Sequence, residues 1–384
     1  MPQFLASMNT NTVFAGRRFP LLRLDARFVL GLVVGIIAGI FLVSNRSGQF
    51  EPARAATYTD GSARLLLWNL RNMYAPWVLE YRGGVKRMWM GGWLTDADRA
   101  NYSRMIQSGV APSATVGPDK IFYSDFIDGA WTHPVLSFDK VGFHVNDPTV
   151  IQPPSSDGID RSYWLYMYYT AIRNDDIEHG DWNRHTIGFA SSLDGGRTWT
   201  DHGIIITQHN GVDTGGAWSP SALVVDNEIW LYYHGNRMPD PAESLQNYRS
   251  RFNLNGWQLI ETDRLIFHHR EPCVWGGTSL AYLCPPTYNA DGLVKVNLDV
   301  SMRDGAFVLL ANDPTSHFIL RFVSTDGLNW QRSPHDTNPI LNAGPYFVTT
   351  PHAEAGAGDR YSIYFGFSGA DNSRFDSIHS WEFH

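Results

Sequence analysis

A recurring proline most constrains what this chain can fold into. Pro76, Pro148 and Pro220 follow one another at an interval of 72 residues, and Pro351 lies about two such units further along. A strand-like run rich in Trp, Tyr, Val and Ile follows each proline. Repeating units of this length, each with several short strands, are typical of propeller blades rather than of a single sandwich.

A second landmark recurs in phase with the prolines. An Asp-Gly or Asn-Gly turn followed closely by Trp begins at Asp128, Asp194, Asn255 and Asp326. The second copy, with Ser192 ahead of it, fits the turn called an Asp box, whose Asp is expected to bond backbone amides of the turn. Together the two landmarks predict an all-β, five-bladed β-propeller. We expect the last segment, 376–383, to close the ring against the first blade.

An apolar run precedes the predicted propeller. Phe28 to Val43 carries no charge, and four arginines stand before it. This pattern predicts a signal-anchor helix with the polypeptide after it outside the cytoplasm. We therefore divide the sequence into a basic segment 1–27, a transmembrane helix 28–45, a linker 46–60 and a propeller 61–384. The predicted location is single-pass in the inner or plasma membrane, with an extracytoplasmic propeller.

Two other interpretations of this run remain open. A cleaved signal peptide needs a small-residue site soon after the apolar region, and Ala53-Arg54-Ala55 lies about ten residues too far along for that. A buried core helix fits poorly with the basic leader.

Cys273 and Cys284, which lie in the predicted propeller, suit a disulfide outside the cytoplasm or two free thiols.

Composition excludes one class of partner and suits another. The net charge is −8 and charged residues make up only 18% of the sequence, so no basic surface for nucleic acid is expected. The 14 Trp and 17 Tyr residues suit both packed sheets and stacking against sugar rings. Cys273 and Cys284 have no His pair nearby in the sequence, so they supply too few ligands for a zinc site.

Three segments carry a resemblance to a known group. The run 144–150 (HVNDPTV), the turn 191–195 with Trp199, and the run 218–222 (WSPSA) are similar to those of the five-bladed propeller glycosidases, glycoside hydrolase families 43, 32, 62 and 68. The resemblance implies a glycan substrate and catalytic acids at the starts of the inner strands. One carboxylic acid protonates the leaving oxygen, and a second carboxylate activates water or attacks the anomeric carbon.

Three acids are candidates for these catalytic roles. Asp147 stands beside Pro148 at a blade start, and Asp299 opens the fourth blade among strand-forming residues. Glu271, next to Pro272, loosely resembles the general acid of the group. Each also has a structural interpretation: a turn cap for Asp147, a buried hydrogen-bonded group for Asp299, and a loop ion pair for Glu271.

Substrate-binding candidates lie near the same blade starts. They are polar or aromatic side chains able to bond or stack on a sugar: His144, Asn146, Asp213, Trp218 and His352. The sequence predicts no cofactor and no metal-ligand cluster, although a calcium ion held by carboxylates and water leaves no recognisable pattern.

One departure from the group divides the functional interpretations. Ala75 stands where the resemblance implies the acid of the first blade, and Ser219 occupies the matching place in the third. The leading hypothesis is a glycoside hydrolase or transglycosylase with redistributed acids, or with its blades permuted so that Asp147 is the base. The alternative is a non-catalytic propeller that binds glycan or protein in cell-surface polysaccharide handling. A six-bladed sialidase-like enzyme is disfavoured, because arginines are not spread over the blade starts.

Overall fold

The fold was analysed in a computed structural model, in which residues 55–384 form one compact unit. The structure describes residues 57–58, 61–62, 64–67, 71–81, 84–93, 119–154, 163–181, 184–207, 216–235, 246–266, 274–275, 282–283, 296–312, 317–332, 340–343, 346–355, 361–368 and 377–383. The expected anchor helix and both cysteines lie outside these residues. Within them, no helix has the length and apolar character needed to cross a bilayer.

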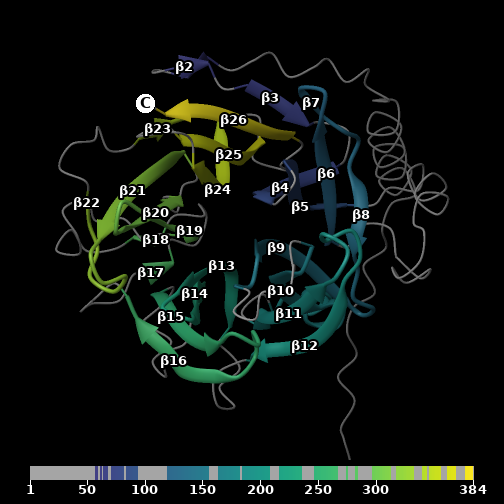
Figure 1. Cartoon of the computed structure of the whole chain (residues 1–384), viewed down its shortest axis with the longest axis vertical. Helices are drawn as coiled ribbons and strands as arrows, with labels where there is room; N and C mark the ends of the chain where they lie inside the picture. The colour runs from purple at the N-terminus through teal and green to yellow at the C-terminus, as the bar shows by residue number, and fades with distance from the viewer. Residues whose placement is uncertain are drawn as a thin grey trace, which may run out of the picture. The chain divides into compact units, whose positions relative to one another are not determined.

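Five antiparallel sheets are arranged around a common centre as the blades of a propeller (Figure 1). Each inner strand pairs with the next strand in sequence, as expected for up-and-down blades. Blade 1 contains β4 (Arg71–Tyr81), β5 (Val85–Trp93), β6 (Asp119–Ile127), β7 (Ala130–Trp131) and β8 (Val135–Phe138). Blade 2 contains β9 (Phe143–Ile151), β10 (Leu165–Arg173), β11 (Thr186–Ser192) and β12 (Thr200–Ile206). Blade 3 contains β13 (Ala217–Val225), β14 (Glu228–Gly235), β15 (Gln246–Asn253) and β16 (Leu259–Leu265).

The remaining two blades complete the ring. Blade 4 contains β19 (Val296–Arg303), β20 (Ala306–Asn312), β21 (Phe318–Ser324), β22 (Gln331–Arg332) and β23 (Leu341–Asn342), and blade 5 contains β24 (Phe347–Ala355), β25 (Tyr361–Ser368), β26 (Ser377–Phe383) and β3 (Arg64–Leu67). Outside the blades lie the hairpins β1 (Thr57–Tyr58)–β2 (Gly61–Ser62) and β17 (Val274–Trp275)–β18 (Tyr282–Leu283), and the short helix α3 (Asn174–Glu178). The five predicted blades are therefore confirmed.

The ring closes in a way that differs from our expectation. The segment 376–383 was expected to pair with the first blade, but β26 is the third strand of blade 5. Its outer neighbour is β3, which pairs with it antiparallel, Ile378 opposite Leu67. A strand from the N-terminal side thus completes the last blade, which leaves β4 free to start blade 1.

Every inner strand has an irregularity at the same level. The register shifts between Tyr74 and Trp77 in β4 and at the corresponding places opposite or within β9, β13, β19 and β24. One residue at each shift has a positive φ: Ala75, Asp147, Ser219, Asn297 and Thr350. In four of the five blades a proline follows this residue. The sequence repeat therefore marks a β-bulge, which bends the strand and re-aims a side chain.

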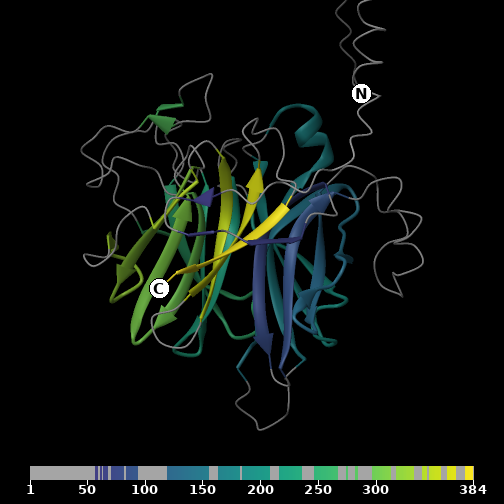
Figure 2. The same cartoon turned by 90° about the horizontal axis from the view of Figure 1, so that it is seen from above.

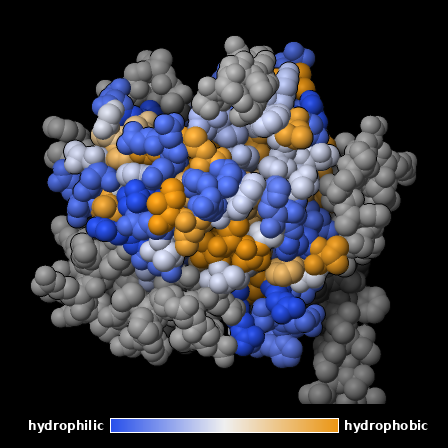
Figure 3. All heavy atoms as spheres, turned by 60° about the horizontal axis from the view of Figure 1, so that its bottom comes forward, coloured by the Kyte–Doolittle hydropathy of each residue, from blue (hydrophilic) through white to orange (hydrophobic). Residues whose placement is uncertain are grey.

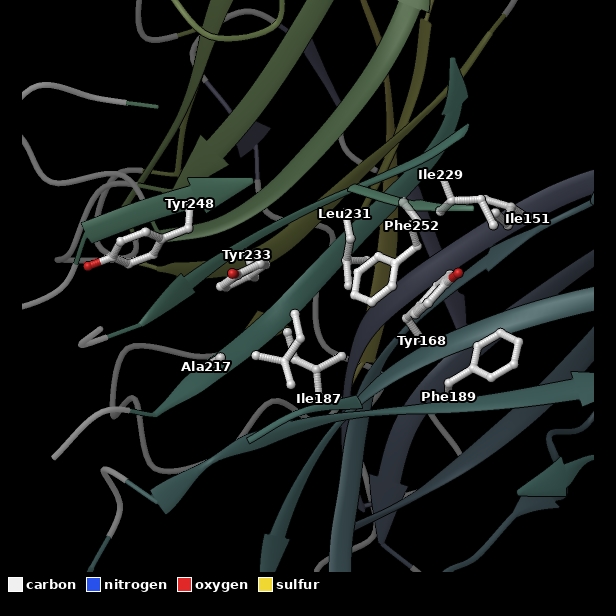
Figure 4. Packing of buried hydrophobic residues seen from close by; sticks show 12 residues of the cluster. Ile151, Tyr168, Ile187, Phe189, Ala217, Ile229, Leu231, Tyr233, Tyr248 and Phe252 are labelled. Carbon is white, nitrogen blue, oxygen red and sulfur yellow. The ribbon is translucent and has the colours of Figure 1, made fainter. Parts of the chain in front are cut away.

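Large side chains pack between neighbouring blades to form the core. Figure 4 shows the cluster between blades 2 and 3, where Tyr168 and Phe189 of blade 2 meet Leu231 and Phe252 of blade 3. Tyr168 also donates a 3.0 Å hydrogen bond to the carbonyl of Gly256 in the next blade. Because the rings fill the wedge between blades and bond across it, adjacent blades are held at a fixed angle.

The Asp-box prediction is confirmed in the turn after β11. Asp194 Oδ1 accepts hydrogen bonds from the amides of Arg197 and Thr198, each at 3.0 Å. Trp199 packs edge-on against Trp89 of blade 1, and its Nε1 donates to Ser137 at 2.9 Å. The turn therefore joins blade 2 to blade 1 and has a structural role.

Replacing Asp194 with Ala should lower the free energy of unfolding by about 1–2 kcal/mol, because two turn amides lose their acceptor. Chemical denaturation would measure the loss. Arg197→Ala in the same turn removes an exposed side chain and leaves these bonds intact, so it should change stability little. Equal losses from both substitutions would contradict the role given to Asp194.

Candidate functional site

Five residues, one from each inner strand, converge at the centre of the propeller. They are the positive-φ residues Ala75, Asp147, Ser219, Asn297 and Thr350, which we call the ring positions. Together with the residues that follow them they line a cavity of about 20 Å³, enough for about one water molecule. A non-glycine residue at positive φ costs of order 1–3 kcal/mol, and such residues cluster at functional sites.

Asp147 is the carboxylate among these ring positions. Its Oδ2 accepts hydrogen bonds from Ser219 Oγ at 2.9 Å and from Thr170 Oγ1 at 3.1 Å. The pKa of Asp147 is raised to about 6, chiefly by burial and less by the nearby Asp119 carboxylate, while the two hydroxyls act to lower it. Asp147 can therefore hold or release a proton close to neutral pH, as an acid–base catalyst must.

A second carboxylate, Asp119, lies at the start of β6 between blades 1 and 2. Tyr74 Oη donates to its Oδ2 at 2.9 Å, and Asn146 Nδ2 lies 3.3 Å from the same oxygen. Asn72 Nδ2 at 3.2 Å and the indole of Trp93 donate to Oδ1. Neutral donors therefore occupy both carboxylate oxygens, so Asp119 is placed to orient its neighbours rather than to bind water itself.

Tyr74, which precedes the ring position Ala75 in β4, belongs to the same cluster. Its hydroxyl accepts a 2.6 Å hydrogen bond from Asn146 Nδ2, and glycines flank its side chain. A Cβ at Gly366 would come within 2.9 Å of Tyr74 Cβ, and one at Gly91 within 3.3 Å of its ring. Burial, followed by the charges of Asp119 and Asp147, raises the pKa of Tyr74 well above its ordinary value. Tyr74 therefore stays a neutral hydroxyl at the pH of the cell.

Aromatic side chains form a cluster at the start of blade 3. The ring of Trp218 lies 4.8 Å from His234, edge-on, and 5.3 Å from His185. His234 accepts a hydrogen bond at Nδ1 from the Asn297 amide, and burial lowers its pKa to about 3. His234 is thus uncharged, and Trp218 lies one residue from the ring position Ser219, where a sugar face could stack.

The structure corrects the placement of Asp299. We aligned it with Asp147, but Asn297 occupies the ring position of blade 4 and Asp299 lies two residues further down the strand. Asp299 Oδ2 accepts a 2.9 Å hydrogen bond from the backbone amide of Ala353, and Asp299 Oδ1 lies 3.2 Å from His352 Nδ1. Both oxygens of this buried carboxylate therefore contact blade 5.

The same bonding recurs at this level around the propeller. The five residues two positions after the ring positions, which we call the inter-blade layer, are Trp77, Thr149, Ser221, Asp299 and His352. Each bonds the backbone of the next blade: Trp77 Nε1 to Val150 O, Thr149 Oγ1 to Ala222 N, Ser221 Oγ to Val300 N, Asp299 Oδ2 to Ala353 N, and His352 Nε2 to Val78 O. Asp299 and His352 are thus two members of a closed circle of inter-blade bonds.

The remaining candidates divide into those the structure places and those it does not. His144 lies beside Asp119, and its Nδ1 accepts a 3.2 Å hydrogen bond from the backbone amide of Asp119. Asn146 donates a hydrogen bond to Tyr74, as described above. Asp213 and Glu271 lie outside the described residues. Asp119 was missed, because it follows a stretch of sequence with no recognisable motif. Among the described residues no group of His, Cys, Asp or Glu is arranged to hold a metal ion.

Comparison with known proteins supports the architecture. No protein-family profile matches the sequence, and no curated protein matches it significantly. A thermostable family-43 glycoside hydrolase matches with a TM-score of 0.53 at 14% identity, over 85% of this protein and 92% of that one. The GH43_1 enzyme of Xanthomonas citri gives 0.53 at 14%, over 86% and 91%. A third structure, named simply as a glycoside hydrolase, gives 0.53 at 12%, over 83% and 90%. At these identities the likeness shows a shared fold, the five-bladed propeller.

Proposed function

We propose that this protein is a glycoside hydrolase that uses Asp147 at the centre of the propeller. The observation that carries the proposal is the pKa of about 6 for a carboxylate at a ring position, in contact with two hydroxyls. The solved structures compared above are glycoside hydrolases by name, which agrees with the proposal. A raised pKa suits the acid that protonates a leaving glycosidic oxygen.

In this mechanism Asp147 gives its proton to the leaving oxygen as the bond to the anomeric carbon breaks. Ser219 and Thr170 hold the carboxyl in place, and Tyr74 with Asn146 lies beside it, oriented by Asp119. A second carboxylate must activate water or attack the anomeric carbon. The sequence suggested Glu271 as a general acid, and in the present mechanism it would instead have to supply this second carboxylate.

A non-catalytic glycan-binding propeller is the second candidate function. The observation that favours it is the absence of a carboxylate at the other four ring positions, which hold Ala75, Ser219, Asn297 and Thr350. Such a site would still offer hydroxyl and amide groups to a sugar and Trp218 as a stacking surface.

One experiment separates the two functions. The full-length protein is incubated with a panel of aryl-glycosides and bacterial polysaccharides, and released sugar and bound glycan are both measured. Release of sugar from any member supports the hydrolase. Saturable binding without release supports the binding function, and neither release nor binding would overturn both.

The raised pKa of Asp147 predicts how hydrolysis depends on pH. Because the acid must be protonated to act, kcat/KM should fall as the pH rises through about 6. A profile measured from pH 4 to 9 on the best substrate of the panel tests this. A rate that instead rises through pH 6 would assign Asp147 the role of base.

A further inference from the structure

A second and larger cavity, which we call the lower cavity, lies further along the inner strands than the ring positions. It has a volume of about 530 Å³ and is lined by all five inner strands. Its lining begins at Trp77, Asp299 and His352 of the inter-blade layer and continues toward the far ends of the strands. The ring cavity next to Asp147 measures about 20 Å³, and only Trp77 lines both cavities. The lower cavity is therefore a separate compartment, of a size that small ligands usually occupy.

Most of its wall is apolar. Aliphatic side chains from four strands contribute to it: Leu79, Ile151, Leu223, Val224, Val300 and Met302. Met302 is 45% exposed, so this wall continues to the protein surface. Figure 3 shows that apolar residues reach the surface across one face of the molecule, as an orange area between hydrophilic ones. A ligand that fills the lower cavity would bury an apolar body against it.

The polar side chains of the lining include three carboxylates, those of Glu80, Asp299 and Glu354. Asp299 is satisfied by His352 and the Ala353 amide, and Glu354 accepts from Lys86 and from the Tyr364 hydroxyl. Glu80 is exposed and has no partner among the residues that the structure describes. The lining thus carries a carboxylate in excess of its own cations, so it favours a positively charged ligand.

The protein itself shows how this region holds an ammonium group. Lys86 Nζ contacts Glu354 and lies 5.5 Å from the centre of the Tyr364 ring and 5.8 Å from that of Phe126. This carboxylate and these aromatic faces together stabilise a primary ammonium. Because β4 and β5 pair Glu80 opposite Lys86, the unpaired carboxylate lies beside this group.

We propose that the lower cavity binds an organic cation with an aliphatic body, its ammonium at Glu80 and its alkyl part along Leu79, Leu223 and Met302. The same chemistry is offered by a free alkylamine and by a lysine side chain of an apolar peptide. This proposal does not depend on hydrolysis at Asp147, since the two cavities are lined by different side chains apart from Trp77.

Calorimetric titration of the full-length protein with three six-carbon probes tests the proposal. Hexylammonium should bind, whereas hexanol should bind more weakly and hexanoate not at all, because only the cation complements Glu80. Glu80→Gln should weaken hexylammonium about two- to fivefold, the usual effect of an exposed ion pair. Asp128→Asn, an exposed acid in the turn after β6, should leave the affinity unchanged.

Further variants locate the site and identify the source of the cation. Leu223→Trp should fill the cavity and abolish binding, and its circular dichroism shows whether it has folded. A short peptide with Lys between leucines, titrated beside hexylammonium, shows which source binds more tightly. Equal binding of hexanol and hexylammonium, no effect of Glu80→Gln, or no binding of any probe would overturn the proposal.

Discussion

Replacing Asp147 with Asn should abolish hydrolysis while leaving the protein at least as stable as the wild type. Asn has the same shape, tolerates a positive φ and can accept from Ser219 and Thr170, but it cannot donate a proton to the leaving group. Loss of a positioned acid typically lowers the rate about 10²- to 10⁴-fold. Glycan binding should persist, because the hydroxyl and amide groups around the site remain.

The same substitution should raise the stability of the folded protein even though it removes the activity. The pKa of Asp147 is raised from 3.8 to about 6 in the folded protein, chiefly by burial. Between these values the unfolded protein holds fewer protons than the folded one, so stability falls as the pH rises, by about 3 kcal/mol in total. Asn carries no charge and escapes this cost. The variant should therefore melt at a higher temperature than the wild type at pH 7–8 and at a similar temperature near pH 4.

Sugar release and melting temperature measured on the same preparations test both parts. Asp304→Asn, at another positive-φ position in a turn of blade 4, is the matched control and should keep full activity. An Asp147→Asn protein that hydrolyses normally would remove Asp147 from the mechanism. One that is both inactive and less stable than the wild type at pH 7–8 would show a structural role instead.

Replacing Asp299 with Ala should destabilise the propeller by about 3–5 kcal/mol, the usual result of removing one partner of a buried charged or hydrogen-bonded pair. The substitution leaves the Ala353 amide and His352 Nδ1 without their acceptor in a buried layer. It also breaks the circle of inter-blade bonds between blades 4 and 5. We therefore expect Asp299 to stabilise the ring.

Chemical denaturation of Asp299→Ala beside Ser221→Ala checks this assignment. Ser221 has the same position in blade 3 and gives one neutral acceptor to the Val300 amide, so its loss should cost only about 1–2 kcal/mol. An Asp299→Ala protein with wild-type stability and no hydrolysis would return Asp299 to the catalytic role.

The sequence predicted the blades well because their inner strands share a local device. A proline after the bulge residue is readable at Pro76, Pro148, Pro220 and Pro351, and each marks a ring position correctly. Blade 4 has Leu298 in place of the proline, so nothing fixed its register. The nearest acid, Asp299, was therefore aligned two residues away from the ring.

The cluster around Asp119 could not be predicted in the same way. Its contacts join residues far apart in the sequence: Asp119 lies 45 residues from Tyr74 and 27 from Asn146. No local periodicity relates these positions, because they meet only when blades 1 and 2 pack together. Nothing in the sequence singled out Tyr74, yet its hydroxyl bonds both Asp119 and Asn146 at the centre of the cluster.

The strand that completes blade 5 has a consequence for how the protein is made. Strands β26 and β3 lie side by side, as the view from above in Figure 2 shows, although about 300 residues separate them in the sequence. Blades 1 to 4 can form as each hairpin leaves the ribosome, but blade 5 cannot be completed until β26 has been synthesised and has paired with β3. Contacts of such long sequence separation form slowly. We therefore expect the completion of blade 5 to be the last and slowest step of folding.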